Sequence, residues 1–316
     1  MSKPRPRPAP TLADLGEDRV VAALTRRLVL GQDVRVGAGD DCAVIGRPRD
    51  ARWQLLKTDV VIEGVHFLPD DDARRVGRKA LCRAISDIAA MGGLPAHALI
   101  TVAAAPALPV AKLEALYAGL RQTARKFGVS IVGGETSRSP GPLFVNVALT
   151  GWVERPHCVL RSGARPGDAL YVTGRLGGSR TGKHLDFTPR LAEARWLVAH
   201  FKPHAMMDLS DGLAADLPRL ATASHCGFEI IHENLPRTPG STVEQALTDG
   251  EDFELLFAVP PRATARLESS WRKRFPKLPL TQIGTLRAPT APRTSRKASN
   301  LNPPPPSRGH DHFAQR

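Results

Sequence analysis

The stretch AMMDLSDGLAADL (residues 205–217) places three aspartates in an otherwise apolar run. AMMD is typical of a buried strand ending at Asp208, LSDG of a turn, and GLAADL of a helix. A carboxylate among apolar side chains stays ionised only if a cation or several hydrogen-bond donors compensate it. We therefore expect Asp208 and Asp211 to face a cation, and Asp216, on the helix, to face solvent.

The composition is that of a globular protein with room for two domains: 316 residues, of which 42% are hydrophobic. No apolar run approaches the roughly 20 residues of a membrane helix, and the basic start MSKPRPRPAP is not followed by the apolar segment of a signal peptide. The four cysteines form no CxxC pair, which argues against a zinc site. We expect a cytoplasmic protein without a membrane partner.

The net charge of +13 is concentrated at the two ends of the chain. Residues 1–10 and 287–316 together carry eight of these thirteen charges. Basic segments rich in Pro and Ser are more often solvated arms than specific readers of nucleic acid. We therefore expect no specific nucleic-acid partner, and most of the tail should be disordered.

Strand and helix patterns alternate along the rest of the chain, which predicts an α/β (α+β) fold in two domains. The turn-rich RSGARPGD (161–168) indicates a boundary between the two domains. Strand-like runs lie at 42–45, 53–62, 97–105, 129–134, 143–153, 169–174, 228–231 and 253–260, and helical patterns at 12–29, 76–92, 110–128, 190–201, 211–224 and 262–274.

Acidic residues recur where an apolar run ends or a helix begins. They are Asp40, Asp41, Asp59, Asp87, Glu135, Asp208, Asp211, Glu251 and Asp252. Strand ends converge on one cleft in α/β folds, and converging carboxylates repel one another unless divalent cations lie among them. Oxygen ligands without a His or Cys cluster suit Mg²⁺.

Each acid alone also has a structural explanation. Asp211 could cap the following helix, Asp40 or Asp41 could form a turn, and Asp87 could lie on the solvated face of a helix. GGSRTGKH (177–184) nearly matches a phosphate-binding loop, but its last position is histidine and Pro189 follows. We interpret that segment as a Gly-rich connector.

Seven motifs resemble, in order and spacing, those of the thiamine-monophosphate kinases, within the superfamily of aminoimidazole ribonucleotide synthetase-like, ATP-using enzymes. The resemblance covers residues 12–286 and returns at RGHDHF (308–313). The motifs are GAGDD, KTDVVIEGVHF, AISDIAAMGG, VGGETSRSP, LRSGARPGD, MMDLSDGLAADL and DGEDFELLF.

The resemblance implies the domain organisation and the site. An ATP- and Mg²⁺-binding domain (12–155) would pair its sheet across a homodimer, and a C-terminal α/β domain (156–286) would follow, with a basic Pro-rich arm (1–11) and a Pro/Arg-rich tail (287–316) at the ends. The implied metal ligands are Asp41, Thr58, Asp59, Asp87, Glu135, Asp208 and Asp211; the ATP contacts are Tyr117, Gly134, Glu135, Arg161 and Ser210; the substrate contacts are His66, Glu251 and Phe313.

Two positions depart from the family pattern. Glu135 stands where the family usually has Asp, which keeps the charge and lengthens the side chain. Lys57 stands where a Ser or Thr usually has a metal role, and a protonated lysine cannot bind Mg²⁺. Either one metal ion is absent, or Lys57 serves as a phosphate-binding cation.

The activity implied is ATP-dependent phosphorylation of thiamine monophosphate to thiamine diphosphate, by direct in-line transfer with several Mg²⁺ ions. The acceptor is an anionic phosphate oxygen, so positioning and charge neutralisation suffice without a catalytic base. One alternative is another ATP-dependent small-molecule kinase or synthetase of the superfamily. A second, from a different class, is a basic nucleic-acid-associated protein.

Overall fold

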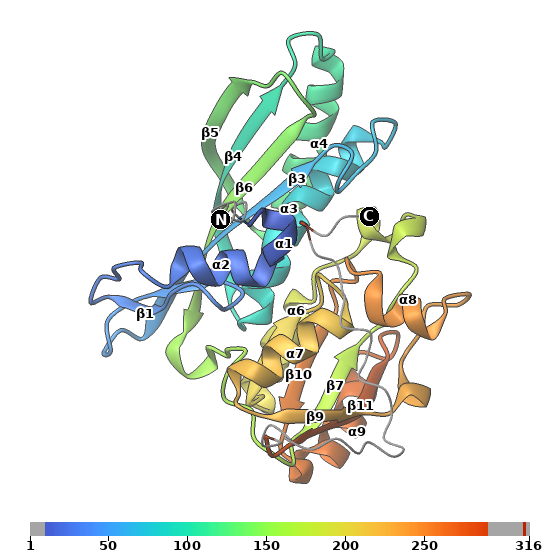
Figure 1. Cartoon of the computed structure of the whole chain (residues 1–316). Helices are drawn as coiled ribbons and strands as arrows, with labels where there is room; N and C mark the ends of the chain where they lie inside the picture. Colours follow the sequence, from blue (N-terminus) through green and yellow to red (C-terminus); the bar gives the residue numbers. More distant parts are fainter. Residues whose placement is uncertain (1–9, 290–311, 314–316) are drawn as a thin grey trace, which may run out of the picture.

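The structure is a computed structural model that describes residues 10–289 and 312–313. The arm predicted over 1–11 and the tail predicted over 287–316 therefore lie for the most part outside the described residues. The described chain forms two β-sheets with helices packed against them (Figure 1). This arrangement confirms the predicted α/β (α+β) fold class.

The first sheet has six strands in the order β1-β2-β3-β6-β4-β5. Its central strand β6 pairs antiparallel with both β3 and β4, and its residues alternate between buried and half-buried. That alternation is typical of a sheet with a single covered face. The strands are β1 (Val34–Val36), β2 (Ala43–Ile45), β3 (Arg52–Ile62), β4 (Leu94–Ala104), β5 (Ser130–Arg138) and β6 (Phe144–Glu154).

Two long helices, α3 (Ala73–Ala90) and α4 (Val110–Phe127), cover one face of this sheet. The side chains of Leu55, Ile85 and Val147 are fully buried in the core between the helices and the sheet. α4 ends at Gly128, as predicted, and the φ of 69° at this glycine is the left-handed conformation that closes many helices.

The second sheet has five strands in the order β8-β10-β7-β11-β9 and lies in the lower part of Figure 1. Helices cover both of its faces: Leu170 packs in the core with α7, and the adjacent Tyr171 packs in the core with α6 and α9. The elements are β7 (Ala169–Thr173), β8 (Ala205–Asp208), β9 (Gly227–Ile230), β10 (Leu255–Val259), β11 (Leu280–Arg287), α6 (Leu191–His200), α7 (Leu213–Ala223) and α9 (Thr264–Arg274).

Helix α3 connects the two sheets. Most of its length packs in the core of the first sheet, whereas Ala89 and Ala90 at its end pack beside Leu197 and Val259 in a core of the second. The division predicted at residue 155 falls between β6 and β7, and the division into domains stays a prediction. In the described part of the chain, no helix has the length and apolar character needed to cross a membrane.

Several elements differ from the sequence prediction. The helix predicted over 12–29 is interrupted at Gly16, where φ is 74°, and ends at Thr25. The sequence prediction does not include β11, because its apolar and polar residues do not alternate clearly. It also does not include β1 and the shorter helices, which are too short to produce a periodic pattern. The elements not yet named are α1 (Leu12–Leu15), α2 (Glu17–Thr25), α5 (Lys183–Asp186), α8 (Val243–Thr248) and the 3₁₀ turns Arg155–His157, Ser179–Thr181, His232–Asn234 and Pro261–Ala263.

Helices α3 and α4 approach so closely that their backbones touch at glycines. A Cβ at Gly119 would lie 1.9 Å from the carbonyl oxygen of Arg74, and a Cβ at Gly77 would lie 2.0 Å from that of Leu116. Any side chain at either position must separate the helices. The spacing of the two helices therefore depends on these two residues.

We expect Gly119→Ala to destabilise the protein by about 1–3 kcal/mol, because the clash outweighs the better helix propensity of alanine. Urea unfolding measures this difference. Gln122→Ala, on the exposed side of the same helix, is the control and should change stability by less than about 0.5 kcal/mol. A Gly119→Ala protein as stable as the parent would contradict the backbone contact.

Candidate active site

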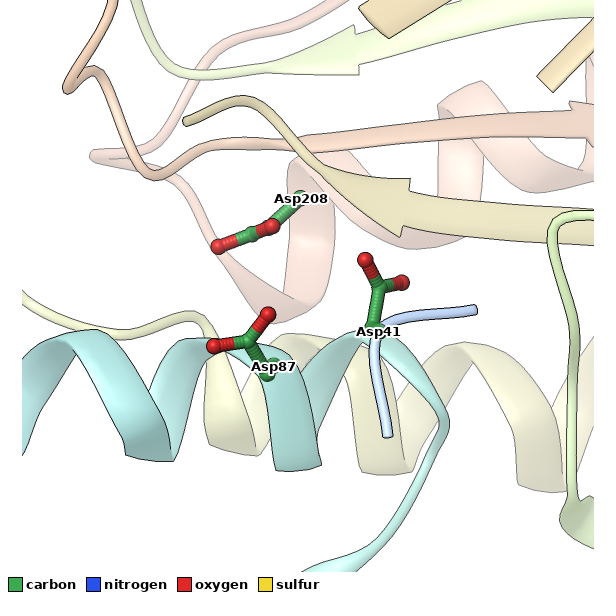
Figure 2. Close-up of side chains that lie close together, drawn as sticks. All are labelled: Asp41, Asp87 and Asp208. Atoms are coloured by element: carbon green, nitrogen blue, oxygen red, sulfur yellow. The ribbon is translucent and has the colours of Figure 1, made fainter. Parts of the chain in front are cut away.

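Three aspartates meet where the two sheets come together. Asp41 projects from the loop before β2, Asp87 from the last turn of α3 and Asp208 from the end of β8. Figure 2 shows their carboxylates pointing into one space, and each offers an oxygen within 4.8 Å of the others. Three of the predicted metal ligands, far apart in the sequence, are thus brought together.

These three side chains are buried, with exposed fractions of 2% for Asp41, 7% for Asp87 and 2% for Asp208. Burial is the main cause that raises the pKa of Asp208 to about 7, and the nearby charge of Asp41 adds to it. Burial likewise raises the pKa of Asp87 well above its ordinary value. The oxygen Oδ2 of Asp41 is buried and has no hydrogen-bond partner among the described residues. A hard divalent cation fits this all-oxygen cluster.

Neighbouring side chains hold the carboxylates in place. Ser86 donates its hydroxyl hydrogen to Oδ2 of Asp208 at 2.5 Å. Arg161 donates from Nε to Oδ1 of Asp41 at 3.1 Å, and its backbone N–H donates to Asp40 at 3.0 Å. Arg161, predicted to contact ATP, therefore lies directly beside the aspartate cluster.

Lys57 lies among the acids on the covered face of β3. Its ammonium Nζ is 2.8 Å from Oδ1 of Asp87 and 3.8 Å from Oδ2 of Asp59. Burial alone would lower the pKa of Lys57, but Asp59 and Asp87 raise it above its ordinary value. Thr58 points to the other side of the strand and donates to Oδ1 of Asn146 at 2.9 Å. The ammonium is therefore a permanent positive charge at this position.

Two cavities meet beside the cluster. The larger, of about 980 Å³, is lined by Thr58, Asp59, Asp87 and Arg161. The smaller, of about 560 Å³, is lined by Glu251 and His184 among others. Residues that line both are His66, Arg83, Ser210, Asp211 and His312. A site with two compartments suits two substrates that react at their junction.

The smaller cavity contains an acid enclosed by cations. Lys79 is fully buried, and its Nζ is 2.7 Å from a carboxylate oxygen of Glu251 and 2.7 Å from Nδ1 of His184. Burial would raise the pKa of Glu251, but His184, Lys79 and Arg83 lower it to about 2. Burial lowers the pKa of Lys79 to about 8 despite the attraction of Glu251. Glu251 is predicted to contact the substrate, and a cationic group of a substrate would therefore compete for it with the protein's own Lys79 and Arg83.

The loop that carries Glu251 is held in an unusual backbone conformation. Glu251 has a φ of 53°, in the left-handed region that residues other than glycine rarely adopt. Its backbone N–H donates to the carbonyl of Ser210 at 2.7 Å, which joins this loop to the LSDG turn. Such conformations are concentrated at functional sites, where the surrounding structure maintains them.

His66 lines both cavities, and one of its two ring nitrogens has no hydrogen-bond partner among the described residues. Nδ1 accepts a hydrogen bond from the backbone N–H of Ile62 at 3.1 Å, whereas Nε2 is buried without a partner among the described residues. Burial, followed by the charge of Arg83, lowers the pKa of His66 to about 3. The neutral ring therefore carries its proton on Nε2 and can donate it in a hydrogen bond to a ligand.

The expectation that Asp216 faces solvent is wrong. Its side chain is fully buried and accepts from the backbone N–H of Asp211 at 3.0 Å and from Arg219 at 3.0 Å. The Asp216 side chain, in the first turn of α7, points into the protein. There it accepts a hydrogen bond from the backbone N–H of Asp211 in the LSDG turn. Asp211 also pairs with Arg219, and the N-cap of α7 is Gly212 instead of Asp211.

Some predicted residues lie away from this junction within one chain. Tyr117 on α4 and Gly134 and Glu135 on β5 are not among the described residues that line either cavity. Phe313 is half-buried and is likewise outside both linings, whereas the ring of the preceding His312 lies 5.4 Å from that of His66. The roles assigned to these four residues stay predictions.

Sequence reasoning missed Lys79, Arg83 and Ser86. Lys79, Arg83 and Asp87 recur at intervals of four residues, a spacing that places them on one face of α3 and could have identified them. The Gly-rich segment before α5 is no P-loop in its geometry, because the helix that follows has only four residues. Lys183 pairs with Asp252 at 2.9 Å there.

Comparisons with known proteins identify relatives of this chain. Residues 39–153 match a family model described as AIR synthase related protein, N-terminal domain. The chain is 39% identical to thiamine-monophosphate kinase of Rhodopirellula baltica, over 85% of this chain and 88% of that one. It is 31% identical to thiamine-monophosphate kinase of Bacillus subtilis, over 95% of this chain and 100% of that one.

A solved structure described as AaThiL complexed with AMPPCP and TMP superposes with a TM-score of 0.76. It is 32% identical and covers 89% of this chain and 93% of its own. A hydrogenase maturation protein, HypE of E. coli, has the same fold at 23% identity, with a TM-score of 0.64 over 74% of this chain and 80% of its own. Because it is 39% and 31% identical to the two thiamine-monophosphate kinases over most of both chains, the chain belongs to the thiamine-monophosphate kinase family.

Proposed function

We propose that this protein transfers the terminal phosphoryl group of ATP to the phosphate of thiamine monophosphate, yielding thiamine diphosphate and ADP. The observation that carries the proposal is the buried cluster of Asp41, Asp87 and Asp208 beside the junction of two cavities. Relatives named thiamine-monophosphate kinase support it. So does a related structure that holds AMPPCP, an ATP analogue with a non-transferable terminal phosphate, together with TMP.

Mg²⁺ is the cofactor that suits the cluster. Asp41, Asp87 and Asp208 would hold it, since they offer only oxygen ligands and Oδ2 of Asp41 has no other partner among the described residues. When bound, Mg²⁺ would neutralise charge on the transferred phosphoryl group. Asp211, which pairs with Arg219, is a less available ligand.

The presence of two adjoining cavities supports a separate place for each substrate. The larger cavity, with Arg161 and Ser210, takes the nucleotide, and the smaller, with His66 and Glu251, takes thiamine monophosphate. Arg83 lines both, and its Nε is buried without a hydrogen-bond partner in the described part of the chain. Its guanidinium can therefore bind phosphate oxygens of donor and acceptor together.

The proposed phosphoryl transfer depends on the alignment of the two phosphate groups more than on acid–base catalysis. The acceptor oxygen belongs to a phosphate that is largely dianionic at pH 7. It attacks the terminal phosphorus of ATP, the bond to the bridging oxygen breaks in line, and ADP leaves with that electron pair. His66 donates its Nε2 hydrogen to the acceptor phosphate, while Arg161 and Arg83 stabilise the charge of the aligned phosphates.

The proposal includes a homodimer in the cytoplasm. Glu135, Gly134 and Tyr117 lie toward the β5 edge of the first sheet, outside the cavities of one chain. The family resemblance implies that these sheets pair between two copies to build the nucleotide site. A second copy would then bring these residues to ATP.

Incubating the purified protein with ATP, Mg²⁺ and thiamine monophosphate should produce thiamine diphosphate and ADP in equal amounts. Chromatographic separation of the products measures both. Thiamine is the control acceptor and should give no thiamine monophosphate, because the smaller cavity is proposed to bind a substrate that already carries a phosphate. ADP release that is independent of thiamine monophosphate would contradict the proposal.

Asp208→Asn should lower kcat by about 100-fold or more and weaken Mg²⁺-dependent ATP binding, because one anionic ligand is lost. The fold should persist, since removing one of three repelling carboxylates relieves strain in the metal-free protein. Asp50→Asn, at an exposed turn, is the matched control with unchanged activity. Full activity of Asp208→Asn would exclude a ligand role.

Stability of the metal-free protein should fall as pH rises from about 4 to about 7. The pKa of Asp208 is raised from 3.8 to about 7 in the folded chain, so between these values the folded state binds a proton that the unfolded state lacks. Asp40, whose pKa burial also raises to about 7, adds to the slope. Mg²⁺ should flatten it, because the bound ion keeps the cluster deprotonated.

Thermal unfolding in EDTA and in Mg²⁺ across this pH range measures the effect. Asp208→Asn should show a shallower slope in EDTA, with the remainder due to other buried carboxyl groups of raised pKa, among them Asp40 and Asp252. A metal-free protein whose stability rises between pH 5 and 7 would show that the cluster is already compensated.

A further inference from the structure

Lys57 occupies a cation position within the acidic cluster. Its ammonium is in hydrogen-bond contact with Asp87 at 2.8 Å and lies 3.8 Å from Oδ2 of Asp59. Only 21% of the Lys57 side chain is exposed. This is the placement of a bridging cation between two carboxylates, here supplied by the chain itself.

Arg83 is a second cationic side chain near Asp59. A guanidinium nitrogen of Arg83 lies 3.8 Å from Oδ1 of Asp59, so Asp59 lies between two cationic side chains. Together Lys57 and Arg83 supply two positive charges, equal to the charge of one divalent ion. Both carboxylate oxygens of Asp59 therefore lie near a cationic side chain, and the buried Oδ2 accepts no hydrogen bond from the described residues.

A divalent ion bridging Asp59 and Asp87 does not fit this geometry. Mg²⁺ binds carboxylate oxygens at about 2.0–2.1 Å, and Oδ1 of Asp87 already accepts a hydrogen bond from the Lys57 ammonium, which lies on the Asp59 side of Asp87. The bound ion would also lie close to a permanent positive charge. The cluster of Asp41, Asp87 and Asp208 keeps other oxygens for a metal, including the unpartnered Oδ2 of Asp41.

We infer that the Lys57 ammonium takes the place of one divalent ion, so that this chain holds no metal between Asp59 and Asp87. The inference rests on the proposed function for the presence of a metal–nucleotide complex. An ammonium has three hydrogens to donate, and Asp87 accepts one. Because Lys57 lines the larger cavity, a phosphate oxygen of the nucleotide can accept another.

The serine or threonine that the family usually has at this position would favour the opposite arrangement. A hydroxyl oxygen is a neutral metal ligand, whereas an ammonium repels a metal. Lys57→Thr should therefore restore the missing site and increase the number of bound ions by one per chain. Lys57→Arg keeps a cation and should leave the number unchanged.

Crystals grown with Mn²⁺ and AMPPCP test the inference, because anomalous diffraction locates and counts Mn²⁺. The wild-type maps should show Mn²⁺ on Asp41, Asp87 and Asp208 and none touching both Asp59 and Asp87. The Lys57→Thr maps should show one additional ion there, and electron paramagnetic resonance titration of free Mn²⁺ should give the same increase in solution. Lys112→Thr is the matched control, with a side chain 25% exposed and paired with Glu63 instead.

An ion on both Asp59 and Asp87 in the wild type would overturn the inference, as would a Lys57→Thr protein that folds and gains no ion. Should that variant fail to fold, the wild-type maps still decide between the two arrangements. Thiamine monophosphate is absent from the experiment. An incorrect acceptor assignment would therefore appear only in the product assay and would leave the metal count unaffected.

Discussion

Asp41, Asp87 and Asp208 repel one another across a buried junction, and the folded chain has to hold them there against that repulsion. Asp87 lies on a long helix and Asp208 at the end of a strand, so neither carboxylate can move away without disturbing its element, and Asp41, in a loop, is held by Arg161. The packing of two sheets against α3 thus keeps together three carboxyl groups whose simultaneous ionisation is unfavourable. A site of this kind attracts a cation because folding already supplies the free energy needed to bring the ligands together.

Positive charge is also built in around the cluster. Lys57, Arg83 and Arg161 each contact an acid of the site, and Arg219 pairs with Asp211. These cations are fixed before any ligand arrives, so little rearrangement is needed when phosphates bind. The site combines side-chain cations with a cluster of three carboxylates, and in the proposed function the phosphates would bind between them.

The sequence predicts the long elements well because their patterns are strong. The run LFVNVALTGWV alternates over its whole length and becomes β6, and α4 ends at its predicted glycine. The error at Asp216 has a different origin: a local pattern does not show that the first turn of α7 faces inward, toward a backbone donor. The contact of Lys79 with Glu251 joins residues 172 positions apart, which no local pattern reveals.

Helix α3 carries residues of both compartments of the candidate site. Lys79 contacts the acid of the smaller cavity, Arg83 lines both cavities, and Asp87 belongs to the aspartate cluster. Eight residues of helix separate the first from the last, a span of roughly 12 Å. The distance between the residues that α3 contributes to the two compartments is therefore set by the rise of the helix. It does not depend on the closing of a loop.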